Sequence, residues 1–117
     1  MNEAINILET IESIIKKDPR YKLDAYSFVL EALHYTVKRL KEARHVSGLE
    51  LLEGIKLYAK EQFGPMARTV FEHWGVQTTE DFGHIVFSLV EARILSKTEQ
   101  DSIDDFKNGY NFEQVFG

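Results

Sequence analysis

The sequence predicts an all-α fold, a single-domain bundle of about six helices. Apolar residues recur at helical spacing through most of the chain, as on one face of a helix. Capping boxes mark two helix starts, and glycine or proline follows the expected ends. No stretch of useful length alternates between apolar and polar residues, so nothing in the pattern favours a sheet.

The overall composition is typical of a soluble globular domain. The chain has 117 residues, of which 44% are hydrophobic and 28% charged. No run approaches the roughly 18 apolar residues that a membrane span needs. The first residues carry acids where a signal peptide would carry basic residues. We therefore expect a cytoplasmic protein that does not bind membranes.

Two features of the composition exclude classes of function. The absence of cysteine excludes disulfides, thiol catalysis and cysteine-ligated metal centres. The net charge of −5 argues against general nucleic-acid affinity, which needs clustered lysine and arginine. Residues 16–44 do carry a modest excess of basic side chains, but a solvated helix face accounts for it.

The first two helices follow from their apolar stripes. The first is expected over residues 2–17 and ends at Asp18-Pro19, because the residue before a proline is pushed out of the α region. The second is expected over residues 23–43. The stripe of the first comprises Ala4, Ile7, Leu8, Ile11, Ile14 and Ile15, and that of the second comprises Tyr26, Leu30, Leu33, Val37 and Leu40.

The third helix begins at a capping box, in which the Ser47 side chain accepts from a free amide and the Glu50 side chain accepts from the amide of the cap. Gly54 lies in the middle of this helix, where glycine costs about 1 kcal/mol relative to alanine. Its presence predicts a close crossing with another helix. The glycine–proline pair at 64–65 ends the third helix and begins a fourth over residues 65–74.

The fifth helix is capped by Thr78 or Thr79 and is dense enough in apolar residues to be central. A second capping box, from Ser96 to Glu99, predicts a short sixth helix that runs to Phe106. The alternative is a small hairpin over residues 94–106, which would make the fold winged-helix-like. The core is expected to contain Leu30, Leu33, Leu52, Ile55, Val70, Trp74, Phe82, Ile85, Val86 and Leu89.

The chain divides into a helical domain over residues 1–109 and an aromatic C-terminal tail over residues 110–117. The tail holds Tyr110, Phe112 and Phe116, which would favour aggregation if they lay in water. We therefore expect the tail to dock, either on the helices of its own domain or on a neighbouring copy or partner.

Several motifs distinguish the middle of the chain: HVSG and ELLEGI between residues 45 and 55, FGPMA at 63–67, WG at 74–75, and TEDFG with IVF between 79 and 87. Together with the segment 97–106, they resemble a family of small uncharacterised bacterial proteins to which no activity is assigned. The resemblance covers most of the chain. It implies a bacterial origin and no particular chemistry.

Three pairs place a carboxylate and an imidazole on one helix face, as metal sites in helical bundles do: Glu31 with His34, Glu42 with His45, and Asp81 with His84. The first two pairs share one helix and lie roughly 16 Å apart, so they cannot meet at one metal. The further glutamates of a dinuclear site are not evident. We predict no metal, no other cofactor and no catalytic residue.

The favoured function is a small protein–protein interaction or regulatory domain that binds an unknown protein or a second copy of itself, as in a homodimer. Its expected interface residues are of types common at binding hot spots: Tyr58, His73, Trp74, Tyr110, Phe112 and Phe116. The alternative is a small-molecule-binding protein or an enzyme with a polar pocket near His45, Arg68, Asp81 and His84. A nucleic-acid-binding winged helix is weaker, since the fifth helix would offer only His84 and Ser88 to bases.

Overall fold

The computed structural model describes residues 3–42 and 44–117, and every element in these ranges is helical. The α-helices are α1 (Glu3–Lys17), α2 (Leu23–Lys38), α3 (Gly48–Phe63), α4 (Ala67–His73), α5 (Thr79–Glu91) and α6 (Phe112–Phe116). Two short 3₁₀ helices, η1 (Gly64–Met66) and η2 (Ile103–Phe106), complete the fold. The all-α prediction is confirmed, and the hairpin over residues 94–106 does not form.

In the part of the chain that the structure describes, no helix has the length and apolarity needed to cross a membrane.

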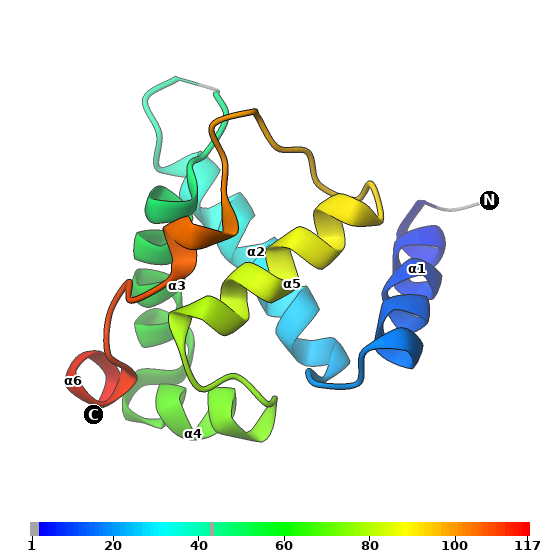
Figure 1. Cartoon of the computed structure of the whole chain (residues 1–117). Coiled ribbons are helices and arrows are strands. Elements are labelled where there is room, and N and C mark those ends of the chain that lie inside the picture. The colour runs from blue at the N-terminus through cyan, green and yellow to red at the C-terminus, as the bar shows by residue number, and fades with distance from the viewer. Residues whose placement is uncertain (1–2, 43) are drawn as a thin grey trace.

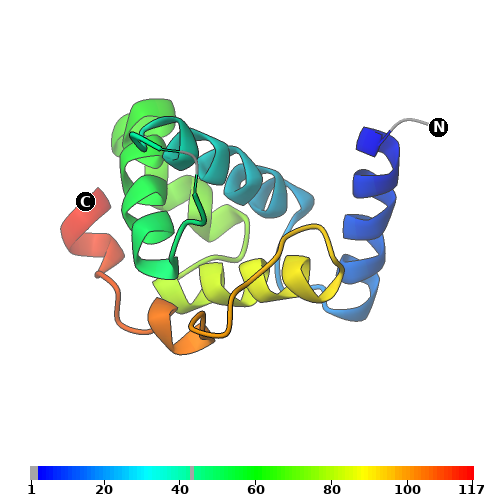
Figure 2. The same cartoon turned by 90° about the horizontal axis from the view of Figure 1, so that it is seen from above.

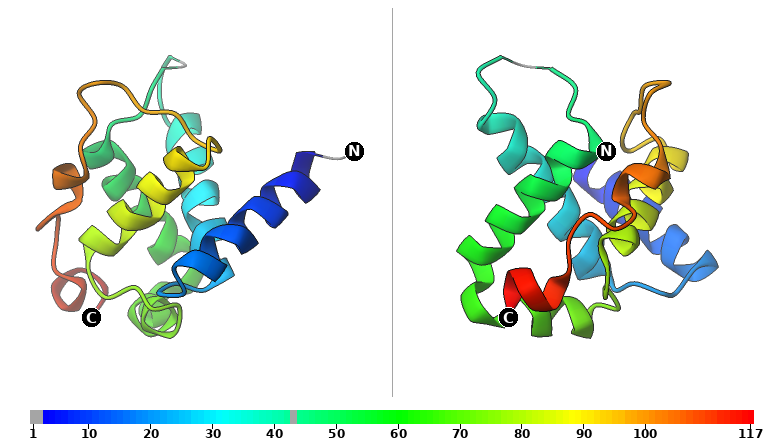
Figure 3. Two further views of the ribbon diagram at one scale, coloured as in Figure 1. Left: turned by 45° about the vertical axis from the view of Figure 1, so that its right-hand side comes forward. Right: turned by 60° about the vertical axis from the view of Figure 1, so that its left-hand side comes forward.

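The long helices α2 and α3 pack against each other, and α5 crosses them (Figure 1). Helix α1 lies at one edge of the molecule, beside α2, and α6 lies at the opposite edge (Figure 2). Helix α4 closes the lower end, where α6 packs on it (Figure 3). The segment between α5 and η2 runs back over the ends of α3 and α5, and it forms one wall of the site described below (Figure 1).

The core is aromatic where α2, α4, α5 and α6 meet. The fully buried ring of Phe71 lies at its centre, with the ring centroids of Phe82 at 5.2 Å, Phe28 at 5.3 Å and Phe116 at 5.4 Å. The predicted core is confirmed: Leu52, Ile55, Trp74, Phe82, Ile85 and Leu89 are buried, and Leu30, Leu33, Val70 and Val86 are partly buried against them.

The close crossing predicted from Gly54 occurs between α3 and α2. A Cβ atom added to Gly54 would overlap the Thr36 Oγ1 atom and would lie 3.0 Å from the Thr36 Cβ. Thr36 is buried, and its hydroxyl donates to the Ala32 carbonyl at 2.7 Å. Glycine at position 54 therefore lets the two longest helices of the core approach each other.

The predicted sixth helix is wrong over residues 96–102. These residues form an extended loop, and the capping box that opens η2 consists of Ser102 and Asp105 instead of Ser96 and Glu99. The Asp101 carboxylate accepts from the Thr98 amide at 2.8 Å and from the His45 ring at 2.6 Å. These contacts tie the loop to the distant link before α3, so the local capping signal does not decide its conformation.

Helix α2 ends at Lys38, earlier than predicted, and Ala43 lies outside the described residues. The amide of Arg39 bonds to the Thr36 carbonyl, and that of Leu40 bonds to Val37, so the last turn tightens before the chain leaves the helix.

The stripe of α1 is covered only in part. Ile11 is buried, and Ile14 and Ile15 pack partly against the core, whereas Ile7 and Leu8 are 38% and 43% exposed. The side chain of Ala4 is not described. The pattern therefore predicted the helix correctly but not the extent of its docking.

Candidate functional site

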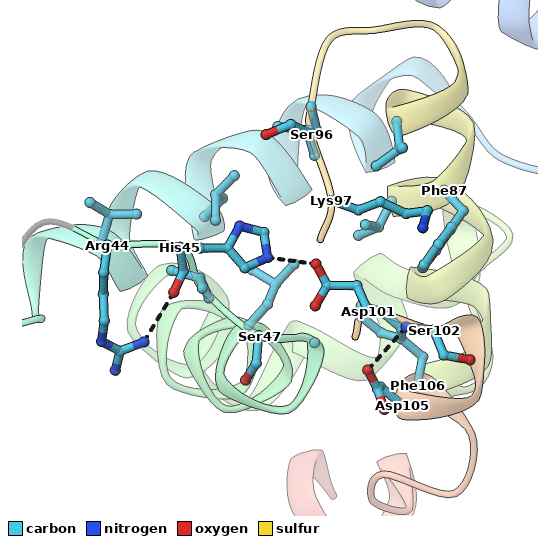
Figure 4. A pocket seen from close by; sticks show the side chains of 18 residues that line it. Arg44, His45, Ser47, Phe87, Ser96, Lys97, Asp101, Ser102, Asp105 and Phe106 are labelled. Carbon is cyan, nitrogen blue, oxygen red and sulfur yellow. Dashed lines mark hydrogen bonds and ion pairs between the residues drawn. The ribbon is translucent and has the colours of Figure 1, made fainter. Parts of the chain in front are cut away.

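The candidate site is a cavity of about 210 Å³ between the end of α2, the start of α3, the second half of α5 and the segment 95–106 (Figure 4). Its wall is mainly apolar, as in sites that bind small organic molecules. On α5, Val86 and Val90 are one helical turn apart and line the same wall. The apolar residues that line it are Leu33, Val37, Val46, Leu51, Val86, Phe87, Val90, Leu95 and Phe106.

The polar residues of the site come from the link before α3 and from the loop 96–102: Arg44, His45, Ser47, Ser96, Lys97, Asp101 and Ser102, joined by Asp105 in η2. Figure 4 shows the imidazole of His45 pointing toward the carboxylate of Asp101 from the other side of the opening. The Nε2 atom of His45 lies 2.6 Å from the Asp101 Oδ2 atom. This contact joins two segments that are far apart in sequence and closes part of the opening.

The ionisation of Asp101 reflects its place in this contact. Partial burial opposes ionisation, but the amide of Thr98 and the ring of His45 together outweigh it and lower the pKa of Asp101. Asp101 is thus held as a carboxylate that fixes both the loop and the imidazole. The Oδ2 atom of Asp101 therefore already accepts from two groups of the protein.

Arg44 and Glu50 hold the other side of the opening. The Arg44 guanidinium donates to both carboxylate oxygens of Glu50, at 2.9 Å and 2.6 Å. The Ser47 amide also donates to Glu50, at 3.0 Å, in the capping box predicted at this position. The hydrogen bonds from Arg44 and from the Ser47 amide lower the pKa of Glu50 to about 2. The link before α3 is therefore fastened to the first turn of that helix.

The four residues of the expected polar pocket lie in different surroundings. His45 lines the apolar cavity, whereas Arg68 pairs with Glu72 at 3.2 Å and lines a separate polar hollow. Asp81 accepts from the Tyr21 hydroxyl at 2.6 Å and serves the capping box of α5. His84 lies 3.7 Å from Glu80, one turn away on the same helix. Their expected common pocket does not form, because each side chain contacts a different partner.

The contact between Tyr21 and Asp81 is a structural one. Burial, followed by the hydrogen bond to Asp81, raises the pKa of Tyr21 well above its ordinary value. Tyr21 is 3% exposed and Asp81 caps α5, so this bond fastens the start of α2 to the start of α5.

Most of the expected interface residues lie in the core. Trp74 is 8% exposed, and Phe112 and Phe116 are each 6% exposed. The Tyr110 hydroxyl donates to the Leu52 carbonyl at 2.8 Å, so the tail docks on the helices of its own chain. The aromatic ring of Trp74 fills the space between Phe63, Phe28 and Phe71 in the same cluster.

Two of the expected interface residues remain near the surface. His73 is exposed at the end of α4. Tyr58 is partly buried on α3, where its ring lies 5.1 Å from that of Tyr35 and 5.5 Å from that of Phe28.

Lys97 and Asp101 were missed by sequence reasoning, as were the wall residues Phe87 and Leu95. The capping box at Ser96 predicts a short helix in the segment 96–106, and a separation of 56 residues hides the pairing of His45 with Asp101. The histidine itself was recognised as a candidate ligand-binding residue. No local motif indicates the residue that faces it.

No group of three histidine or carboxylate side chains in residues 3–42 and 44–117 is placed to hold a metal ion. That the purified protein carries no metal stays a prediction, which elemental analysis can check.

No protein-family model, curated protein or solved structure matches the chain. The resemblance to small bacterial proteins therefore stays a prediction. The geometry of the cavity is the strongest basis for assigning a function.

Proposed function

We propose that the protein binds a small, mainly apolar molecule in the cavity between α2, α3, α5 and the segment 95–106. The apolar cavity itself carries this proposal. An engineered cavity of about 150 Å³ with a similar aliphatic and aromatic lining binds benzene. The present volume of about 210 Å³ leaves room for a ring and a short chain. The polar opening would orient such a ligand while the wall removes its apolar surface from water.

Ligand binding at this position would couple separate parts of the fold. The cavity is lined by α2, α3, α5, η2 and the loop 96–102, so a ligand would contact all of them at once. A molecule that binds only the folded state stabilises it, by about 2.7 kcal/mol at a ligand concentration one hundred times the Kd. A small domain whose folded state is stabilised by a ligand in this way can act as a ligand-dependent regulator.

Filling the cavity is expected to abolish ligand stabilisation. Val90 lines the cavity and is partly buried, so phenylalanine in its place would occupy the space of a ligand ring. We expect indole, titrated to saturation, to raise the Tm of the wild-type protein but not that of Val90→Phe. The measurement is a thermal denaturation series with increasing indole.

The matched control is Val115→Phe, which makes the same change at a partly buried valine of α6 that does not line the cavity. This variant is expected to keep the indole-dependent rise in Tm. An equal rise in all three proteins would place binding outside the cavity, and no rise in the wild type would argue against an apolar ligand of this size.

A second candidate function, protein–protein interaction, is favoured by the outer face of α2 and α3. Tyr35 and Tyr58 lie side by side there, and the Arg39 guanidinium lies 5.5 Å from the centre of the Tyr35 ring. Lys38 and Arg39 are exposed and form no ion pair within the described residues. Tyrosine and arginine are common at interface hot spots, and free basic groups fit an acidic partner surface. A second copy of this acidic chain is the simplest such partner.

Reversing the charge of this face is expected to weaken self-association. We expect wild-type protein to increase in mean mass with concentration in sedimentation experiments at low salt. The variant Lys38→Glu with Arg39→Glu should stay monomeric, while Lys16→Glu with Lys17→Glu, an equal charge change on α1, should behave as wild type. A wild-type protein that is monomeric at every concentration would contradict a homodimer.

A further inference from the structure

We propose that the ligand of the apolar cavity carries a carboxylate, and that Lys97 binds this group at the opening. This inference rests on the proposed function and adds the chemical class of the ligand: a small apolar carboxylic acid in its ionised form. The inference follows from a comparison of the basic side chains at the opening, some of which have a carboxylate partner in the protein while one has none in the described parts of the chain.

Three side chains at the opening can carry positive charge, and two of them have carboxylate partners. Arg44 is bound by Glu50 through two hydrogen bonds, and His45 is bound by Asp101. Lys97 forms no ion pair within residues 3–42 and 44–117. Among the described residues, the Lys97 Nζ atom has one polar contact, a long one of 3.5 Å to the carbonyl of the adjacent Thr98. The ammonium group of Lys97 is therefore free to bind an anion.

Lys97 is held at the cavity by the loop that carries it. The carboxylate of Asp101 accepts from the amide of Thr98, the next residue, and at the same time contacts His45 across the opening. Lys97 and Phe87 both line the cavity, and Figure 4 shows the side chain of Lys97 extending from the loop. Lysine stems commonly lie along apolar surface in this way while the charged end stays in water. The backbone at Lys97 is thus fixed, and its ammonium borders both the apolar wall and solvent.

The acidic groups at the opening do not offer an equivalent site for a cation. Asp101 directs its Oδ2 atom to His45 and Thr98. Asp105 accepts from the Ser102 amide in the capping box of η2. Glu50 is bound by Arg44 and by the Ser47 amide. These carboxylates are engaged with the protein, which leaves an anionic ligand favoured over a cationic one.

A carboxylic acid with a short apolar body suits both parts of the site. The body would lie against Leu33, Leu51 and Val86 in the apolar wall, and the carboxylate would remain at the opening. This arrangement buries apolar surface and leaves the charge partly hydrated, so the carboxylate avoids the large desolvation penalty of full burial.

The test compares three probes that share a phenyl ring and a three-carbon chain: 3-phenylpropanoate, 3-phenylpropanamide and 3-phenylpropylammonium. We expect the carboxylate to bind about fivefold more tightly than the amide, the gain that an exposed ion pair supplies, and the ammonium to bind most weakly. The measurement is isothermal titration calorimetry at low salt, repeated at high salt, where the preference for the carboxylate should shrink.

The variant Lys97→Met removes the charge and keeps the apolar stem. It is expected to bind the carboxylate and the amide equally, while Lys107→Met, which removes a lysine paired with Asp104 away from the cavity, should keep the preference. If both probes bind equally to the wild type, or if the preference survives in Lys97→Met, the carboxylate inference is wrong although the cavity still binds apolar molecules. If none of the three probes binds and indole also fails, the proposed function itself is wrong.

Discussion

Removal of the C-terminal tail after Asn108 is expected to cost most of the stability of the fold. The tail supplies Phe112 and Phe116, which lie against Phe71 at ring-centroid distances of 5.7 Å and 5.4 Å. Replacing one buried phenylalanine by alanine costs about 3–5 kcal/mol, and whole domains are stable by about 5–15 kcal/mol. We expect the truncated chain to be largely unfolded or to melt far below the full-length protein, as followed by circular dichroism on heating.

The tail also contributes polar contacts that truncation would remove. The Tyr110 hydroxyl donates to the Leu52 carbonyl at 2.8 Å, and the Gly109 amide donates to the Thr79 hydroxyl at 3.0 Å. Thr79 is buried and donates in turn to the Phe106 carbonyl at 2.6 Å. Truncation after Asn108 would thus remove one of the two hydrogen bonds of the Thr79 hydroxyl, at the contact between α5 and η2.

A milder variant keeps this prediction testable if the truncated chain cannot be purified. Phe116→Ala is expected to lower the free energy of unfolding by about 3 kcal/mol in urea denaturation, with an unchanged mass in solution. The control is Gln114→Ala, at an exposed position of the same helix. Unchanged stability in Phe116→Ala, or a loss of dimer without a loss of stability, would mean that the tail serves an interface instead of the core.

The substitution Gly54→Ala is expected to destabilise the protein by about 2 kcal/mol, although alanine is the better helix former by about 1 kcal/mol. The added Cβ would overlap Thr36 Oγ1 and approach the Thr36 Cβ to 3.0 Å. Thr36 is a short, branched side chain on a buried helix face, so it cannot turn away without losing its bond to Ala32. Helices α2 and α3 would have to separate, and urea denaturation would measure the loss.

A double-mutant cycle isolates the cause of this loss. Thr36→Ala removes the oxygen that the new methyl group would overlap, so Gly54→Ala should cost much less in a Thr36→Ala background than in the wild type. Gly64→Ala is not a suitable control, because φ at Gly64 is +54° and alanine would be strained there whatever its surroundings. Equal costs in both backgrounds would show that the crossing does not depend on this contact.

Local sequence determined where several helices begin and end. The capping box of Ser47 and Glu50 opens α3 as predicted, and the glycine–proline pair at 64–65 ends it. Such signals act within one turn, since a cap needs only a side chain and an amide three residues away. Gly54 also indicated a close approach correctly, because a glycine in mid-helix is costly unless something packs against it. The apolar periodicity in turn indicated which residues form the core.

Other features depended on contacts that are distant in sequence, and only the tertiary structure decided them. The second capping box, at Ser96, does not start a helix in the structure. The contacts of Asp101 with Thr98 and His45 hold residues 96–102 as a loop instead. A capping box is worth about 1 kcal/mol, so a few tertiary contacts can override it.

The candidate site shows the same division between local and distant interactions. The sequence identified His45 as a candidate ligand-binding residue, but it grouped His45 with Arg68, Asp81 and His84, which each have a different partner in the structure. The cavity instead joins His45 to Lys97 and to the wall of α5. Periodicity predicts that a helix face is covered without specifying what covers it, because the hydrophobic effect has no direction. The packing of α2, α3 and α5 and the path of the loop 96–102 therefore decided which side chains meet.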